Sequence, residues 1–206
     1  PMLQGYANSD NAIQTARATL FVQRELNFSL HHKADFKILL GVRGQLYHSS
    51  LNDHFSSLLP SPRISISCKP YWKEDILFRL AGGVYLQPPF YREYRRADGI
   101  LDENLEAQKS YQAIASADWN MQLFNKPFKL TGDVFYKYID DLVPYTIDNL
   151  RLRYEPDKQA VGYAAGISLR LNGELVEGLE SWASLSLMRT REDIVGDSLG
   201  WQPRPT

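Results

Sequence analysis

One short segment holds the side chains best suited to grip a ligand. It combines tyrosines, arginines and a glutamate, and a sparser group of the same kinds follows further along the chain. Aromatic faces and guanidinium forks bind anionic or sugar-bearing molecules. The candidate ligand contacts are Tyr91, Arg92, Glu93, Tyr94, Arg95, Arg96, Tyr145, Arg151 and Arg153. The alternative is a set of solvated loops in which these Arg and Glu side chains pair with each other or hold one loop against its neighbour.

Patterns typical of catalysis or metal binding are not found in the sequence. The four histidines share no metal-ligand spacing with acidic or thiol partners, and Cys68 is the only cysteine. Asp140 and Asp141 are neighbours, so in a strand they point to opposite faces. No Ser-His-Asp pattern, glycine-rich phosphate loop or nucleophile elbow occurs. We therefore expect no enzyme, no metal site and no cofactor.

The charge and hydropathy of the 206 residues exclude two further classes. The formal net charge is −1 and acidic and basic residues are interspersed, so the basic surface of a nucleic-acid binder is missing. No apolar run approaches the roughly 20 residues that a membrane-spanning helix needs. A β-barrel passes this test, because only every second residue of its wall meets lipid.

A period of two residues in hydrophobicity predicts four hairpins of antiparallel strands. In the first strand, for example, Leu20 and Val22 belong to an apolar face and Thr19 to a polar one. The predicted pairs are 18–30 with 36–47, 63–69 with 78–87, 112–123 with 129–138, and 165–171 with 183–190. The expected turns are 31–34, 72–74, 125–127 and 172–174.

The lengths of strands and connections favour a membrane barrel. Short turns alternate with long connections at about residues 49–62, 88–108 and 143–159, as in barrels with short periplasmic turns and long outer loops. Strands of about 13 to 15 residues, tilted near 40°, would rise roughly 35 Å and cross a hydrocarbon core of about 30 Å. We therefore expect an all-β fold, an antiparallel transmembrane β-barrel segment of about eight long strands in four hairpins.

The same alternation assigns charges to the inside of the barrel. A charge that faces lipid at the midplane costs about 2 to 4 kcal/mol, so charged strand residues are expected to face the lumen. Arg24 falls on the apolar face and is expected near an interface, where its stem can snorkel. The lumen-facing charges are Arg79, Lys129, Asp133, Lys137 and Arg170. Aromatic girdles are expected from Tyr47, Tyr71, Trp72, Tyr85, Phe124, Phe128, Tyr136, Tyr138 and Trp182.

Several short motifs, in this order and spacing, resemble the barrel of TonB-dependent receptors from about residue 14 onward. The later motifs are similar to receptors that carry a carboxypeptidase-regulatory-like domain ahead of the plug. The first group is Gly41-Val42-Arg43, Ser61-Pro62-Arg63, 78–85 and 87–93. The second group is Leu142-Val143-Pro144-Tyr145, Asp148-Asn149, 151–154, 162–166 and 181–186.

The resemblance implies a nutrient receptor in the outer membrane of a Gram-negative bacterium, with a barrel of about 22 strands closed by an N-terminal plug and energised by TonB. Residues 1–206 would be an internal part of that barrel, without the plug, the remaining strands or the segment that contacts TonB. The start at Pro1 and the turn-like tail 201–206 agree with an internal fragment. The implied partners are outer-membrane lipid, the plug, TonB and a nutrient: a siderophore, cobalamin, a glycan or a peptide. Nucleic acid is not among them.

Two other architectures share the alternating pattern. One is a complete small eight-stranded barrel, either an outer-membrane adhesin or a ligand carrier. The other is a soluble β-sandwich that binds carbohydrate and buries its apolar faces between two sheets. Ragged ends and very long loops favour the receptor segment over both.

Overall fold

The computed structural model describes residues 13–31, 33–96, 99–103, 105–148, 151–176 and 178–203, without the side chains of 52–57, 148 and 151. The expectations about Pro1, residues 204–206 and Asn149 fall outside these residues. The expectation of a turn-like tail without a strand is wrong at Gln202–Pro203, which pairs with Arg191 and Glu192. Eight long strands carry the fold: β1 (Thr15–Leu30), β2 (Ala34–Ser49), β3 (Asn52–Pro70), β4 (Asp75–Gln87), β5 (Gln108–Leu123), β6 (Lys126–Leu142), β9 (Ala160–Val176) and β10 (Leu179–Ile194). Three short strands complete it: β7 (Tyr145–Asp148), β8 (Arg151–Tyr154) and β11 (Gln202–Pro203).

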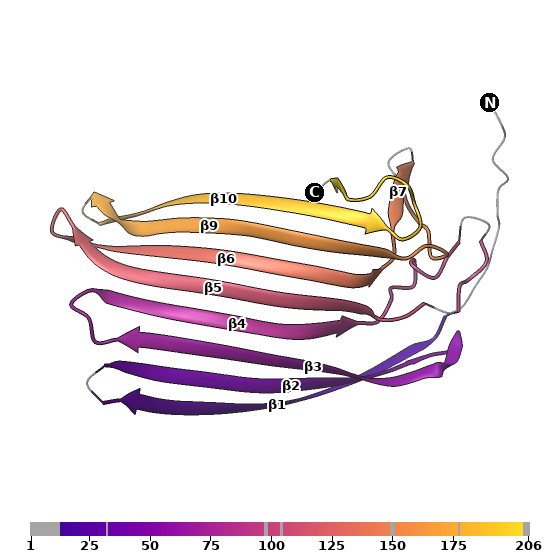
Figure 1. Cartoon of the computed structure of the whole chain (residues 1–206), viewed down its shortest axis with the longest axis horizontal. Helices are drawn as coiled ribbons and strands as arrows, with labels where there is room; N and C mark the ends of the chain where they lie inside the picture. The colour runs from indigo at the N-terminus through magenta and orange to yellow at the C-terminus, as the bar shows by residue number, and fades with distance from the viewer. Residues whose placement is uncertain are drawn as a thin grey trace.

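The strands form one large antiparallel sheet. Its order is β1-β2-β3-β4-β5-β6-β9-β10-β11, and β7 and β8 form a separate two-stranded hairpin. The sheet is open, with β1 and β11 as its outermost strands (Figure 1). The prediction of an all-β antiparallel fold with eight long strands in four hairpins is therefore confirmed. No helix among the described residues is long and apolar enough to cross a membrane.

The two ends of the sheet differ in how they connect the strands. Short turns join the four hairpins at one end, and the long connections 88–107 and 143–159 lie at the other, where the second one contains β7 and β8 (Figure 1). The predicted long connection at 49–62 is wrong, because only Ser50 and Leu51 separate β2 from β3. We call the two ends of the sheet the turn end and the loop end.

Prolines explain why residues 49–62 resemble a loop in sequence. Pro60 and Pro62 lie inside β3 and pair with β2, but the pairing of β3 with β4 begins only at Arg63. Proline has no N–H to donate, so strands tolerate it where one edge is unpaired. Just beyond the last β3–β4 pair, the Ser61 hydroxyl accepts a hydrogen bond from the Leu86 N–H at 3.2 Å. A hydrogen bond to a side chain thus takes the place of the backbone ladder at this point.

Two of the predicted turns also lie elsewhere. The β5–β6 turn is Phe124-Asn125, both with positive φ, and Pro127 already pairs with Gln122 inside the hairpin. Gly178, with positive φ, directly precedes β10, and Gly173 is inside β9. A Cβ on Gly173 would lie 2.1 Å from the Phe128 ring, so this glycine serves close packing rather than a turn.

Side chains that pair directly across antiparallel strands share one face of the sheet. One such row runs through Phe28, Phe36, Cys68, Phe78, Ala117, Gly132, Leu169 and Leu185. The neighbouring row on the other face contains Arg79, Ser116, Asp133, Ser168 and Ser186. The sheet therefore has an apolar face and a polar face, and the predicted lumen charges Arg79, Lys129, Asp133, Lys137 and Arg170 all belong to the polar one.

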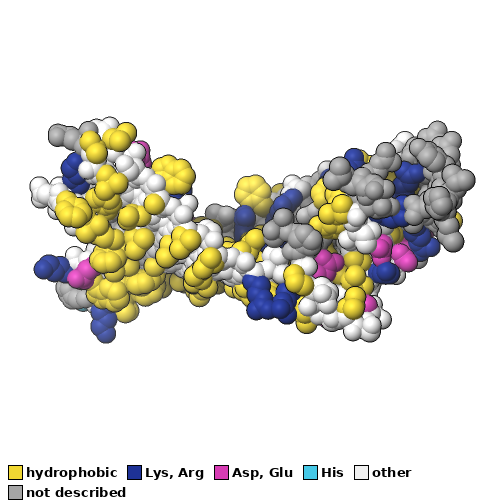
Figure 2. Space-filling view, turned by 90° about the horizontal axis from the view of Figure 1, so that it is seen from above, with side chains coloured by type: hydrophobic (Ala, Val, Ile, Leu, Met, Phe, Trp, Pro, Cys, Tyr) yellow, Lys and Arg dark blue, Asp and Glu magenta, His cyan; other side chains and the backbone are white. Residues whose placement is uncertain are grey.

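The cluster of buried hydrophobic side chains lies in the loops, whereas the buried hydrophobic residues of the strands are scattered. Tyr94, Leu105 and Val143 form a buried cluster, and Leu51, Leu101 and Tyr154 pack around it. Apart from Leu51 of the β2–β3 turn, these residues come from the long connections at the loop end, which we call the loop cap (88–96, 99–103, 105–107, 143–148 and 151–159). Over the strands, many hydrophobic side chains stay exposed, and Figure 2 shows them gathered over the strand region of the molecule.

Candidate functional site

The segment with the strongest ligand-binding chemistry lies in the loop cap, between β4 and β5. Its middle is buried: the Glu93 carboxylate accepts hydrogen bonds from the Phe90 N–H at 2.8 Å and from the Gln108 amide at 3.1 Å. Burial raises the pKa of Glu93, although these two hydrogen bonds act in the opposite direction. Glu93 therefore holds the loop in shape.

Tyr94 anchors the same loop to the sheet. Its side chain is only 2% exposed, and burial together with a hydrogen bond to Tyr47 of β2 raises the pKa of its hydroxyl. The Arg17 guanidinium lies over the Tyr47 ring, 5.3 Å from its centre. The anchor thus joins the loop cap to the first two strands of the sheet.

The tip of this loop remains open to contact. Tyr91 is 63% exposed, and the Arg92 Nε donates a hydrogen bond to the Tyr91 hydroxyl at 2.9 Å. The Arg92 guanidinium also lies 5.6 Å from the centre of that ring. Arg95 is exposed, whereas Arg96 forms an ion pair with the buried Asp102 at 2.7 Å. Tyr91, Arg92 and Arg95 are therefore available for contact, whereas Arg96 helps to fix the shape of the loop.

The second predicted group occupies the β7–β8 hairpin of the loop cap. Tyr145 and Tyr154 pair across the two strands, and their ring centres lie 6.0 Å apart. Arg153 is exposed on β8, and the side chain of Arg151 falls outside the described residues. Tyr154 also packs against the cluster of Tyr94, Leu105 and Val143, so this hairpin lies against the loop that contains Tyr94.

An acidic centre lies on the polar face of the sheet. One Asp118 oxygen contacts Arg79 at 2.8 Å and Lys129 at 3.2 Å, and the other accepts a hydrogen bond from the Thr131 hydroxyl at 2.9 Å. Three neighbouring strands supply these groups. The period of two in the sequence places Arg79, Asp118 and Lys129 on the polar face. It does not show that Asp118 contacts the other two, because those contacts depend on the register of the strands.

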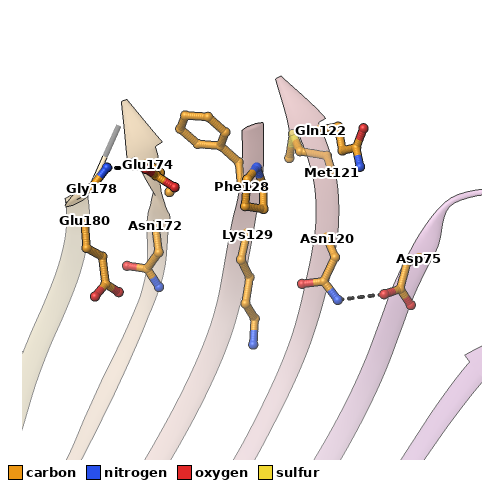
Figure 3. Close-up of a pocket in the computed structure, with 12 residues that line it drawn as sticks. Asp75, Asn120, Met121, Gln122, Phe128, Lys129, Asn172, Glu174, Gly178 and Glu180 are labelled. Carbon is orange, nitrogen blue, oxygen red and sulfur yellow. Dashed lines mark hydrogen bonds between the residues drawn. The ribbon is translucent and has the colours of Figure 1, made fainter. Parts of the chain in front are cut away.

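A shallow groove of about 820 Å³ extends this polar face toward the turn end. Asp75, Asn120, Lys129, Asn172 and Glu180 line up across five strands and point the same way (Figure 3). Asn120 donates to Asp75 at 2.8 Å, and Arg170 beside the groove donates to Asn172 at 3.1 Å. Such a row offers both donors and acceptors to a polypeptide laid across it.

No group of three or more His, Cys, Asp or Glu side chains that could hold a metal ion occurs among the described residues. Comparisons with protein-family models, with curated proteins and with solved structures find no match to this chain. The fold and the chemistry of its two faces therefore carry the functional argument.

Proposed function

We propose that this chain is part of the barrel wall of an outer-membrane receptor of the TonB-dependent type, which imports a nutrient. The observation that carries the proposal is an apolar face that stays exposed across the sheet while parts of the polar face are buried. On the polar face Asp118 is 4% and Gln45 7% exposed, whereas on the apolar face Leu20 is 73% and Leu185 60% exposed. A protein in water buries its apolar face, so this arrangement fits a wall with hydrocarbon outside and polar groups inside.

Aromatic residues border the apolar face near both of its ends. Toward the turn end, the rings of Phe28 and Phe36 stack 5.3 Å apart. Toward the loop end, Tyr136 stacks on Tyr163 at 6.2 Å. Along β6, Phe128 and Tyr136 are eight residues apart, which is about 26 Å along the strand. For a strand tilted by about 30° the rise is about 23 Å, close to the apolar band of about 25 Å between two girdles.

The stagger of the hairpins supports tilted strands. Phe28 lies two residues before the end of β1, whereas Leu169, in the same row six strands away, lies seven before the end of β9. Five residues of stagger over six strand spacings correspond to a tilt of about 30°. Barrel strands tilt by about 35 to 45°. A β-sandwich gives no reason for such a regular stagger.

The two candidate sites then have different partners. The polar face, with the Asp118 centre and the groove, would contact the plug domain of the same receptor. The loop cap would face the outside, where Tyr91 and Arg92 would meet the nutrient. TonB would act through the plug, and the identity of the nutrient stays open among siderophores, cobalamin, glycans and peptides.

The competing architectures would need contacts that the described residues do not make. A carbohydrate-binding β-sandwich would cover the apolar face with a second sheet, but the described residues form one large sheet and the small β7–β8 hairpin. A complete eight-stranded barrel would pair β1 with the last strand, and these lie at opposite edges. Both observations favour a section of a larger wall.

The membrane placement is tested with single cysteines in the full chain refolded into phosphatidylcholine vesicles. After Cys68→Ser, a fluorescent probe is attached at Leu20, Val134 or Leu185, and at Thr19 or Ser168 as matched positions on the other face. Quenching by lipid-attached spin labels is expected at the first three sites only. Equal quenching on both faces would contradict the barrel wall, and a chain that stays in buffer without lipid would contradict membrane insertion.

The import function needs a separate test in cells that produce the complete receptor whose barrel would contain this chain. Uptake is measured for labelled cyanocobalamin, a ferric siderophore, a maltooligosaccharide and a short peptide. One of these is expected to accumulate, and the accumulation is expected to stop when a protonophore removes the proton gradient. Accumulation of none, or accumulation that ignores the protonophore, would contradict the proposal.

A further inference from the structure

One band of the polar face carries cations and no acidic residue. It lies between the Asp118 centre and the loop cap, where two neighbouring rows of paired residues cross β1 to β6. The first row is Gln23, Gly41, Arg63, Gly83, Gln112 and Lys137. The second consists of Phe21, Arg43 and Ser61 on β1 to β3 and of Tyr85, Ser110 and Ile139 on β4 to β6. We call these residues the basic band, because their only charges are those of Arg43, Arg63 and Lys137.

The cations of the basic band lack the carboxylate partners found elsewhere on this face. Toward the turn end, for example, Lys37 pairs with Glu25 at 2.8 Å. In the basic band, Arg63 donates only a long hydrogen bond of 3.5 Å to the Gln23 amide oxygen. Arg43 likewise has an amide oxygen as its acceptor, at 3.3 Å. Among the described residues no carboxylate pairs with any of the three cations, so their charge is left for an anion from elsewhere.

Two glycines keep the surroundings of Arg63 open. Gly41 faces it from β2 and Gly83 from β4. A Cβ on Gly41 would lie 2.9 Å from the Arg63 Nε, so the arginine side chain lies across the space that a larger residue would fill. Arg43 is a diagonal neighbour of Arg63 on the adjacent strand, about 7 Å away, and both side chains are exposed. Two guanidinium groups can therefore reach one anion.

We infer that the basic band binds an anionic ligand with at least two carboxylate or phosphate groups. Guanidinium forks bind such oxygens in pairs, so one anionic group would lie between Arg43 and Arg63. Lys137 lies three strands from Arg63, a distance of about 14 Å, and would hold a second group as a point charge. The ligand would thus extend across the middle strands of the sheet.

The inference deepens the proposed function and rests on it for the role of the ligand. In the proposed barrel, the basic band would line the lumen on the side of the loop cap, beyond the Asp118 centre and the groove that would contact the plug. A nutrient that passes the loop cap would meet the basic band next. The imported nutrient would therefore be a molecule with several negative charges, and an uncharged glycan would not fit.

The test titrates the full chain in detergent micelles, at low salt, with a tetraglutamate peptide blocked at both ends. This peptide extends to about 13 Å, and tetraglutamine is the matched probe without charge. Tetraglutamate is expected to bind the native chain in a calorimetric titration, and Arg63→Gln is expected to raise its Kd about tenfold, the size of a lost charged hydrogen bond. Gln23→Glu gives Arg63 a carboxylate of its own and is expected to weaken binding by a similar factor. Arg24→Gln removes the same charge from the apolar face and is expected to leave the Kd unchanged.

Tetraglutamine that binds as tightly as tetraglutamate would overturn the inference. So would equal Kd values for R63Q and R24Q, or a native Kd for Q23E. The quenching pattern in vesicles is recorded in parallel. Quenching on the apolar face alone, together with failed peptide binding, would remove the anion site and leave the barrel wall. Peptide binding together with equal quenching on both faces would keep the anion site and remove its place in a lumen.

Discussion

The sheet and the loop cap use the same hydrophobic residues in opposite ways. Leu105 in the loop cap is 8% exposed, whereas Leu185 on the sheet is 60% exposed. The loop cap folds as a small protein in water does, around Tyr94 and Val143. The sheet satisfies its backbone through its ladders and leaves many side chains of its apolar face exposed. The surroundings, and not residue type, decide where hydrophobic side chains are buried.

The largest expected effect distinguishes the core of the loop cap from the sheet. Tyr94→Ala removes a fully buried ring and its hydrogen bond to Tyr47, and is expected to cost the loop cap about 3 to 5 kcal/mol. Hydrogen exchange followed by mass spectrometry should show fast exchange at 88–107 and unchanged protection in β9 and β10. Equal loss of protection in β9 would mean that loop cap and sheet unfold as one unit.

A charge on the apolar face tests the other half of the comparison. Leu185→Arg is expected to lower the free energy of unfolding in phosphatidylcholine vesicles by about 2 to 4 kcal/mol, because the charge must enter hydrocarbon. Ser186→Arg, one residue away on the polar face, is the control and is expected to cost far less. Denaturant titration measures both, and equal costs would contradict the assignment of the two faces.

Removal of the acidic centre should have an intermediate effect. Asp118→Asn leaves Arg79 and Lys129 without their shared counter-charge and is expected to cost about 1 to 3 kcal/mol. Arg79 and Lys129 are partly exposed, so water recovers some of the loss and the lower end of this range is expected. The same titration measures it, and Asp133→Asn serves as a neighbouring control on the same face.

The smallest expected effect is a pH dependence confined to the loop cap. The pKa of Glu93 is raised in the folded state, so the folded loop cap holds this proton more tightly than the unfolded chain. The stabilisation is present below the ordinary glutamate pKa and is lost as pH rises through the raised value. Protection factors at 88–107, corrected for intrinsic exchange, should fall over that range, and Glu93→Gln should remove the change. A rise in protection with pH would contradict the assignment.

Much of the sheet could be predicted because a sheet with one apolar and one polar face alternates hydrophobic and polar residues along each strand. The four hairpins, the opposite orientation of Leu20 and Thr19, and the polar position of Arg170 all follow from a period of two. Proline and glycine wrongly predicted a loop at Pro62 and a turn at Gly173. Pro62 instead lies in a strand next to an unpaired edge, and Gly173 allows close packing. Strand register depends on residues far apart in the sequence, so the contacts of Asp118 could not be predicted from the residues around it.

The candidate ligand-binding residues of 91–96 were likewise predicted only in part. Its position in a long connection followed from the composition of 88–108, and Tyr91 and Arg92 are exposed as a contact residue must be. Glu93 and Tyr94 belong to the same run of residue types, yet they turn inward because the loop needs an anchor on Tyr47. Sequence shows which side chains are chemically able to bind, and folding of the loop selects among them.

The prolines of β3 have a consequence for the shape of the rim. Above Arg63, β3 stays with β2 while the chain of β4 leaves it and enters the loop cap. The backbone ladder between β3 and β4 thus ends next to Pro62, where the missing proline N–H rather than a change in hydrophobicity limits the pairing. Two prolines therefore coincide with the level at which these neighbouring strands separate at the loop end of the sheet.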